Sequence, residues 1–314
     1  MAAKTSPVSH WPKPRALRPG DPVAVVAPSG PAPAARLSAG TALLADRYRV
    51  EQSDGLTQKL GFLAGDDGRR LAELRWALSD PRLAAVFCAR GGHGALRLLP
   101  SLLDVRGEEL PARPLIGFSD VTVLHAFLAL HKRVSIHGPV VTQLGELPAS
   151  DRAQLFALLE NSDPPPPISG LVSIGVSQRE TTGRLLGGNL EVLSRLCGTP
   201  LQRVFSQSGP LVLMIEEVTE SPYRIDRALT HLRQSGMLDH VVAAVVGDLT
   251  RCEGPDGHPS ALDVIVERLG GLGVPVLAGV PLGHGARNRA VPLGVAVHVD
   301  PRRGQIDFLE SAVR

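Results

Sequence analysis

Short apolar runs alternate with amphipathic stretches through the first half of the chain. The β-branched run at 23–26 is followed by Pro28-Ser-Gly30, which predicts a buried strand that ends in a loop. Apolar Leu71, Leu74 and Leu78 recur at helical spacing before Asp80, which predicts an amphipathic helix over 66–79. The same order recurs twice, with strands at 84–90 and 115–116 and helices at 95–103 and 121–130. Strands that alternate with helices favour a parallel sheet with helices on both faces, so we predict an α/β domain over 21–147.

The second half of the chain is richer in expected strands. Its apolar runs predict strands at 171–176, 210–215, 241–247, 276–278 and 295–299, and its helical patterns fall at 189–196, 224–234 and 261–269. Between the halves, the proline run at 163–168 is a stiff, extended segment. We therefore predict a polar leader at 1–20, a proline-rich linker at 148–169 and a smaller, strand-rich α/β domain over 170–314.

Composition and charge restrict the class of protein. Apolar residues make up 43% and charged residues 20% of the chain, which is typical of a folded globular protein. The net charge of +2 and the 4% aromatic content give no basic surface interleaved with stacking rings, so we expect no nucleic-acid partner. The leader has no apolar stretch of signal-peptide length and no run of 18 apolar residues follows, so we expect a cytoplasmic protein without a membrane span.

Motifs for metals and cofactors are missing from the sequence. Cys88, Cys197 and Cys252 form no CxxC or Cys/His cluster, and no HExxH occurs. The glycine loop Arg90-Gly-Gly-His-Gly94 offers backbone N–H groups to an anion, but Arg97 stands where a dinucleotide fingerprint requires a small residue. We therefore expect no catalytic metal and no cofactor.

The segment Leu115-Ile-Gly-Phe-Ser-Asp-Val-Thr122 combines a short strand, a sharp turn and the start of a helix. A serine at such a turn projects its hydroxyl from the sheet, and the N–H groups of the helix N-terminus favour a developing oxyanion. This arrangement suits Ser119 as a nucleophile. An ordinary helix N-cap would use the same residue types, because serine and aspartate are preferred there.

A serine nucleophile needs a base and usually a carboxylate that orients the base. Spacing alone does not choose among four histidines that stand near glycine-rich turns or strand ends: His93, His137, His258 and His284. Glu216 and Glu217 end a strongly apolar run, where an unpaired carboxylate is expensive to bury and a histidine or arginine partner is expected. Because neighbouring strand positions face opposite ways, one of the two glutamates points into a given cleft.

Eight short motifs stand in a consistent order between residues 22 and 299. They are Val25-Val-Ala-Pro-Ser-Gly-Pro31, Gly61-Phe-Leu-Ala-Gly65, Phe87-Cys-Ala-Arg-Gly-Gly-His-Gly94, Ile116-Gly-Phe-Ser-Asp-Val-Thr122, His137-Gly-Pro139, Leu185-Leu-Gly-Gly-Asn-Leu190, Ile215-Glu-Glu-Val-Thr-Glu-Ser-Pro-Tyr-Arg-Ile-Asp226 and Gly279-Val-Pro-Leu-Gly-His284. In this order they resemble the LD-carboxypeptidase family of serine peptidases, which includes muramoyltetrapeptide carboxypeptidases and microcin C self-immunity peptidases. One motif alone is weak, but eight in order are specific.

The resemblance implies a role for each candidate residue. It implies Ser119 as the nucleophile, Glu216 as the acid and His284 as the base. It also implies an oxyanion hole made by the backbone N–H groups of Gly92 and Asp120, and it implies a homodimer.

Two positions depart from the family's pattern. His93 stands where the family usually has an aromatic residue, which changes the expected shape of the substrate pocket. Glu217 stands where the family more usually has aspartate, so the choice between Glu216 and Glu217 depends on the alignment of this short strand.

The resemblance implies hydrolysis of the amide between an L-configured diamino acid and a terminal D-alanine in murein tetrapeptides, as in peptidoglycan recycling. The expected partner is thus a murein peptide. A carboxypeptidase must also recognise a free carboxylate, which suits arginine or backbone donors. From their positions we expect Arg90, Gly91 and Arg184 to contact the substrate.

Two alternative functions remain open from the sequence. The microcin C branch cleaves aminoacyl-adenylate analogues and tends to carry a loop whose aromatic side chain stacks on the base; here the tryptophans, Trp11 and Trp76, fall in the leader and in a predicted helix. The second alternative is a catalytically silent, two-domain ligand-binding protein. The presence of all three residues of the implied triad favours an enzyme.

Overall fold

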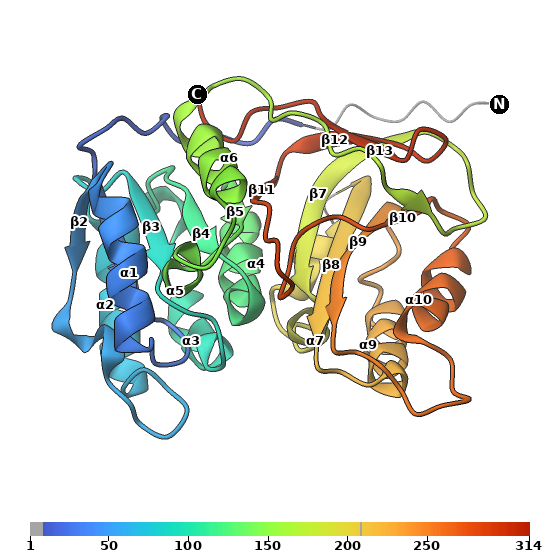
Figure 1. The fold of residues 1–314 in the computed structure, drawn as a ribbon, viewed down its shortest axis with the longest axis horizontal. Helices are drawn as coiled ribbons and strands as arrows, with labels where there is room; N and C mark the ends of the chain where they lie inside the picture. The colour runs from blue at the N-terminus through green and yellow to red at the C-terminus, as the bar shows by residue number, and fades with distance from the viewer. Residues whose placement is uncertain (1–8, 208) are drawn as a thin grey trace. The chain divides into compact units, whose positions relative to one another are not determined.

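The computed structural model describes residues 9–207 and 209–314, and the chain divides into two compact units. The N-terminal unit comprises residues 12–162, 286–292 and 312–314. The C-terminal unit comprises residues 163–285 and 293–311, together with residues 9–11 of the described chain. Figure 1 shows that each unit is built around a sheet of its own. Both units therefore include segments that are distant in the sequence.

The N-terminal unit is built on a sheet of short strands: β1 (Pro22–Val26), β2 (Arg49–Gln52), β3 (Ala85–Cys88), β4 (Leu115–Gly117), β5 (Ser135–His137) and β11 (Val291–Leu293). The strand order is β11-β5-β4-β3-β1-β2, and every pair from β5 to β2 is parallel. Because these strands are parallel, the loops that follow β1, β3 and β4 leave the sheet at the same edge.

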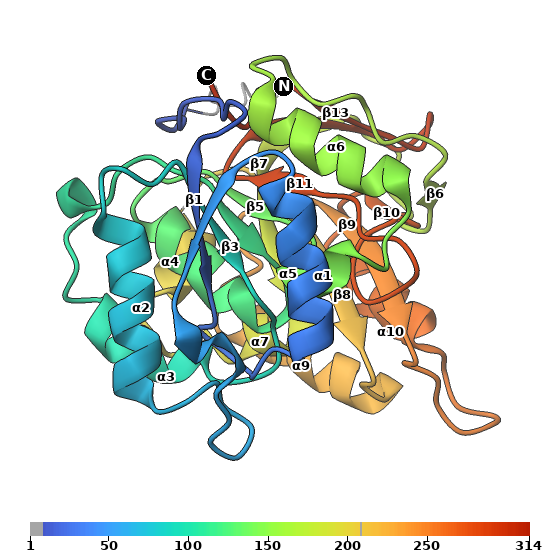
Figure 2. The same ribbon diagram turned by 60° about the vertical axis from the view of Figure 1, so that its left-hand side comes forward.

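Helices connect these strands: α1 (Ala34–Ala45), α2 (Asp67–Ser79), α3 (Ala95–Leu102), α4 (Thr122–Leu130), α5 (Val141–Leu144) and α6 (Ala149–Glu160), with the 3₁₀ turns η1 (Asp54–Thr57), η2 (Gly107–Glu109) and η3 (Ser119–Val121). Helix α3 contacts α2 and α4, whereas α1 contacts α5. Figure 2 shows β1 and β3 between α2 on one side and α1 on the other. The expected parallel sheet with helices on both faces is confirmed.

The core of the N-terminal unit includes apolar side chains that lie on one face of the sheet, at every second position of its strands. Val23 and Val25 of β1 pack in one buried cluster with Phe87 of β3 and Ile116 of β4, and Val313 near the chain end joins them. Residues two apart on a strand share a face. Burying side chains of this size stabilises the fold by roughly 1.5–3 kcal/mol each. The packed sheet thus gives a rigid base to the loops at its edge.

Two expected segments differ from the observed chain. Residues 149–160 of the expected linker form helix α6, and its Leu155 and Leu159 are buried in the core of the N-terminal unit. Apolar residues at helical spacing favour a helix in this segment, and the proline run does not interrupt it because the run begins after the helix ends. In the expected polar leader, Trp11 and Leu17 are buried, while residues 1–8 lie outside the described residues.

The C-terminal unit is built on a mixed sheet with longer strands: β6 (Val172–Ser173), β7 (Thr181–Asn189), β8 (Leu211–Val218), β9 (Val241–Thr250), β10 (Val276–Ala278), β12 (Ala296–Asp300) and β13 (Gln305–Phe308). The strand order is β13-β12-β7-β8-β9-β10-β6. The central strands β7 to β10 are parallel, and the outer strands pair antiparallel. The carboxyl ends of β8 and β10 therefore lie at one edge.

Four helical segments complete the description of this unit: α7 (Leu190–Ser194), α8 (Gln202–Gln207), α9 (Pro222–Gln234) and α10 (Ala261–Gly270). Helix α9 contacts both α7 and α10. It begins at Pro222, which is favourable because the first turn of a helix needs no backbone N–H donor. Ser260 and Asp263 form a capping box at the start of α10. Among residues 9–207 and 209–314, the helices are too short or too polar to cross a membrane.

Candidate active site

Ser119 stands in a strained turn at the carboxyl end of β4. It begins η3, with Phe118 alone between it and the strand, and its φ is +63°. This left-handed conformation is rare for residues with a side chain and costs about 1–2 kcal/mol. Backbone strain of this kind concentrates at functional sites because the surrounding structure must hold it in place. The half-buried Ser119 therefore has the setting of a nucleophile at a strand-to-helix elbow.

The glycine loop after β3 lies directly against the serine. A Cβ atom at Gly91 would lie 2.9 Å from the Cβ of Ser119 and 3.1 Å from its Oγ. Gly30, in the loop after β1, donates its N–H to the carbonyl of Gly91 at 3.0 Å. Gly92 has a φ of +106°, which a residue with a side chain rarely adopts. The loops after β1, β3 and β4 are thus linked through Gly91, which lies against both Gly30 and Ser119, and glycine is needed for this close approach.

Two buried charged side chains hold the glycine loop. Asp120 accepts the N–H of Ala95, at the start of α3, at 2.8 Å. The fully buried Arg70 donates from Nη1 to the carbonyl of Gly94 at 2.9 Å and also to the carbonyl of Pro28. Because leaving a buried charged group without partners is costly, these bonds favour a single arrangement of the loops.

The remaining candidates of this unit lie on the outer side of the same loop. Arg90 is exposed and donates from Nη1 to the carbonyl of Pro31 at 2.8 Å. His93 is exposed too, and its ring meets Phe62 edge to face at 5.1 Å between centroids. The N-terminal unit therefore brings together five of the expected residues: Ser119, Gly91, Gly92, Asp120 and Arg90.

The C-terminal unit pairs a buried carboxylate with a half-buried histidine. Oε2 of Glu216, near the end of β8, lies 2.7 Å from Nδ1 of His284, in the loop after β10. The Glu216 side chain is fully buried, and the other oxygen, Oε1, has no hydrogen-bond partner among the described residues. A carboxylate on Nδ1 fixes the tautomer in which Nε2 accepts a proton.

The loop that carries His284 is held on both sides of the histidine. Gly283 has a φ of +123°, and a Cβ there would lie 3.0 Å from Oε2 of Glu216. Gly285 donates its N–H to Oδ2 of Asp248 at 3.1 Å. Burial, with a further contribution from the charge of Glu216, raises the pKa of Asp248, while the Gly285 N–H opposes this rise. Asp248 is thus a second carboxyl group beside the Glu216–His284 pair.

Glu217 has a different set of partners. Its carboxylate accepts N–H groups from the Asn189 side chain at 2.9 Å, from Val218 at 2.8 Å and from Glu191 at 2.7 Å. Burial raises the pKa of Glu217 to about 7, although these three donors lower it. Of the two glutamates left open by the sequence, Glu216 contacts the histidine, and Glu217 holds the start of α7.

Arg184 is a packing residue in the C-terminal unit. It is 2% exposed, its guanidinium lies 4.3 Å from the ring centroid of Trp11, and it donates to the carbonyl of Gly294. Arg184 is in register with Leu211 at the start of β8, whereas Glu216 is near the end of that strand. The two positions are therefore roughly 16 Å apart along the sheet. This burial contradicts the expected contact with substrate, and we leave Arg184 out of the site.

The other candidate histidines occupy different surroundings. His137 is buried at the end of β5, with its ring 5.9 Å from that of Phe118, the residue before Ser119. His258 lines a cavity of the C-terminal unit beside Tyr223.

Sequence reasoning missed three polar residues that support the site. Asp248 follows the apolar run 241–247, the same signal that identified Glu216, and could have been found. Arg70 and His125 lie within helical patterns that give no such signal. His125 is buried, with Nε2 2.9 Å from the carbonyl of Gly117, and burial lowers its pKa to about 4, so it is neutral at pH 7.

Comparison with protein families covers segments of both units. A family described as the LD-carboxypeptidase N-terminal domain matches residues 23–138, and the LD-carboxypeptidase C-terminal domain matches residues 182–299. The murein tetrapeptide carboxypeptidase of Pseudomonas aeruginosa is 35% identical over 252 residues, which cover 77% of this chain and 80% of that protein.

Two solved structures have a similar fold. The muramoyltetrapeptide carboxypeptidase of Oxalobacter formigenes has a TM-score of 0.78 and 27% identity, covering 91% of this chain and 98% of that one. The microcin C7 self-immunity protein MccF has a TM-score of 0.85 at 19% identity, covering 96% of this chain and 99% of that one, and so shares the fold. The two family matches together span most of the sequence, and the chain belongs to the LD-carboxypeptidase family.

Proposed function

We propose that the protein is a serine carboxypeptidase that releases the terminal D-alanine of murein tetrapeptides, a reaction of peptidoglycan recycling. Family membership and the relative from Pseudomonas aeruginosa support this reaction class. The observation that carries the proposal is the pairing of the buried carboxylate of Glu216 with His284. The segment that matches the family's N-terminal domain holds Ser119 in a strained turn. An activated serine and a carboxylate-bound imidazole are the parts of a hydrolytic triad.

In the proposed reaction, Nε2 of His284 takes the proton of Ser119 as Oγ attacks the carbonyl carbon of the amide before D-alanine. A C–O bond forms, and the carbonyl electron pair moves onto oxygen. The C–N bond then breaks, and the imidazolium gives its proton to the departing amine of D-alanine. Water then attacks the acyl carbon as Nε2 of His284 takes its proton; the ester C–O bond breaks, the imidazolium returns the proton to Oγ of Ser119, and the shortened peptide leaves with a free carboxyl group. Glu216 stabilises the imidazolium in both halves of the reaction.

The oxyanion of each tetrahedral intermediate needs preorganised donors. We assign this role to the backbone N–H groups of Gly92 and Asp120. The contact of Gly91 with Ser119 and the position of Asp120 directly after the nucleophile support this assignment. Loss of one such donor typically costs about 10²–10³-fold in kcat.

The configuration of the scissile bond separates this function from other peptidase activities. We expect the purified protein to release D-alanine from a murein tetrapeptide and to leave the same peptide ending in L-alanine intact, with free alanine quantified by chromatography. An aminoacyl-sulfamoyl adenosine serves as a third substrate. Cleavage of that compound without D-alanine release would favour the activity of the self-immunity branch, and cleavage of none of the three would favour a binding role.

The assembly state and cellular location belong to the same proposal. We propose a homodimer, for which light scattering should give about twice the 33.2 kDa of one chain. We propose a cytoplasmic location, where recycled murein fragments would be the substrate, and fractionation of cells that express the protein tests it.

A further inference from the structure

A pocket of about 510 Å³ adjoins the glycine loop in the N-terminal unit. It lies between the turn after β1, the segment 57–62 and the loop after β3, and Gly92 forms part of its wall. Because Gly91 is in contact with the side chain of Ser119, this pocket is next to the proposed nucleophile within one rigid loop system. A group bound here would extend from a scissile bond held at Ser119.

The charges that line the pocket are of one sign. Lys59 and Arg90 both contribute to its wall, and none of its described lining residues is acidic. Nη1 of Arg90 donates to the carbonyl of Pro31, which also lines the pocket, so the guanidinium is held against the pocket lining. No ion pair within the described residues neutralises Lys59 or Arg90, so an anion that entered would meet two cations.

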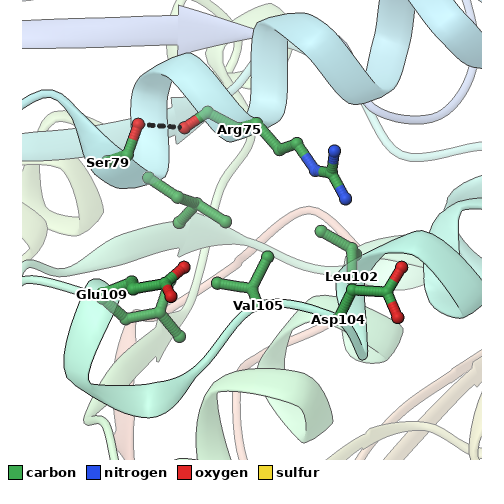
Figure 3. A pocket seen from close by; sticks show the side chains of 8 residues that line it. Arg75, Ser79, Leu102, Asp104, Val105 and Glu109 are labelled. Atoms are coloured by element: carbon green, nitrogen blue, oxygen red, sulfur yellow. Dashed lines mark hydrogen bonds between the residues drawn. The ribbon is translucent and has the colours of Figure 1, made fainter.

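A second cavity in the same unit provides a contrast. It measures about 310 Å³ and lies between α2 and the segment that follows α3 (Figure 3). There Arg75, the one cation among the described lining residues, lies beside Asp104 and Glu109 and donates to the carbonyl of Ser101 at 2.6 Å. Its charges are mixed, whereas the pocket beside Gly92 has a net positive lining.

The apolar part of the pocket limits the shape of its ligand. Pro31, Pro33 and Phe62 line it, and the ring of His93 lies edge to face against that of Phe62, which is 63% exposed. A lining that combines apolar side chains with two cations suits a short aliphatic group that ends in an anion.

We propose that this pocket binds a carboxylate of the peptide substrate, with Lys59 and Arg90 as specificity-determining residues. The inference rests on the proposed function for the identity of the ligand. A murein tetrapeptide offers two such carboxylates close to the scissile bond. One is the terminus of D-alanine, and the other is on the side chain of the third residue when that residue is diaminopimelate.

Binding to the inactive Ser119→Ala protein tests the pocket without turnover. Calorimetry would compare three tetrapeptides: one with diaminopimelate and a free C-terminus, its C-terminal amide, and the form with lysine at the third position. We expect Lys59→Gln and Arg90→Gln each to weaken binding of the first peptide roughly tenfold or more, because each removes a charge-assisted contact. Arg90→Lys should retain part of the affinity, and the exposed Lys132→Gln outside the pocket should bind as the parent does.

The modified peptides identify which carboxylate enters. If Lys59→Gln does not weaken binding of the C-terminal amide, the terminal carboxylate is the group that enters the pocket. If Lys59→Gln does not weaken binding of the lysine peptide, the side-chain carboxylate of diaminopimelate is that group. Equal losses of affinity for all three peptides, no loss for any of them, or no binding to the Ser119→Ala parent would overturn the proposed role of the pocket.

Activity measurements distinguish a failure of this role from a failure of the proposed function. D-alanine release by wild type with a KM unaltered in Lys59→Gln would overturn the pocket alone, whereas charge-dependent binding without release would overturn the function alone.

Discussion

Oε2 of Glu216 lies 2.7 Å from Nδ1 of His284, and the carboxylate is fully buried. The imidazole is thereby held with Nδ1 as donor and Nε2 as acceptor, which is the tautomer that a general base requires. A fixed, buried negative charge also stabilises the imidazolium that forms when the base takes a proton. The neighbouring Glu217 contacts three N–H groups instead of the histidine, so it provides a matched comparison.

Glu216→Gln should lower kcat for D-alanine release about 10³–10⁴-fold, because the amide disfavours the productive tautomer and cannot stabilise the imidazolium. Glu217→Gln should retain kcat within a factor of about ten, since Glu217 does not touch the histidine. Steady-state kinetics of both variants, with circular dichroism as a check on folding, measure this difference. Equal losses in the two variants would contradict the assignment of Glu216.

Ser119→Gly should release backbone strain that Ser119→Ala retains. With a φ of +63° at this position, glycine fits at little cost, whereas alanine keeps a Cβ in the left-handed region. We expect the glycine variant to be more stable than the alanine variant by about 1 kcal/mol in urea unfolding, although both lack the nucleophile. Equal stabilities would show that the turn is not strained.

Gly91→Ala should reduce activity by about 10²-fold, because its Cβ would lie 2.9 Å from the Cβ of Ser119 and displace the serine. Gly270→Ala is the control, since a Cβ at that position meets no atom within 4 Å. Comparison of kcat/KM for the two variants measures the effect. A Gly91→Ala enzyme as active as the control would mean that the loop moves without consequence.

Glu217 should make the protein less stable as the pH rises. Its pKa is raised by burial to about 7 from an ordinary value of 4.5, so between these values the folded state holds the proton more tightly than the unfolded state. The stabilising contribution is complete below pH 4.5 and is lost as the pH passes 7. The free energy of unfolding of Glu217→Gln, relative to wild type, should rise over this range by up to about 3 kcal/mol. Parallel pH profiles of the two proteins in urea unfolding would contradict this.

Much of the fold and part of the site follow from local sequence patterns. The apolar runs predict the parallel strands of the N-terminal unit because these strands are buried on both faces. The turn at Ser119 and the carboxylates at the end of β8 can also be predicted, because in each case polar residues directly follow or end an apolar run. The proline run after residue 162 predicts an extended linker, and this signal hides helix α6, which ends just before it.

The contacts that decide roles join distant parts of the chain, so they cannot be predicted from one sequence. Periodicity shows that Glu216 and Glu217 face opposite ways, but only the fold shows which of them meets His284. The sequence does not reveal that Arg184 packs against Trp11, because the two residues are far apart along the chain. Without that contact, Arg184 is predicted to be free to bind substrate. Arg70 belongs to an amphipathic helix whose pattern does not reveal that its guanidinium reaches the carbonyl of Gly94.

The central claim is that Ser119 acts with His284 and Glu216 to release D-alanine from a murein tetrapeptide. The most direct test is the time course of D-alanine release by wild type and by Ser119→Ala under identical conditions. We predict steady release by wild type and none above the uncatalysed background by a folded Ser119→Ala protein. Release by both proteins would contradict the nucleophile, and release by neither would contradict the reaction.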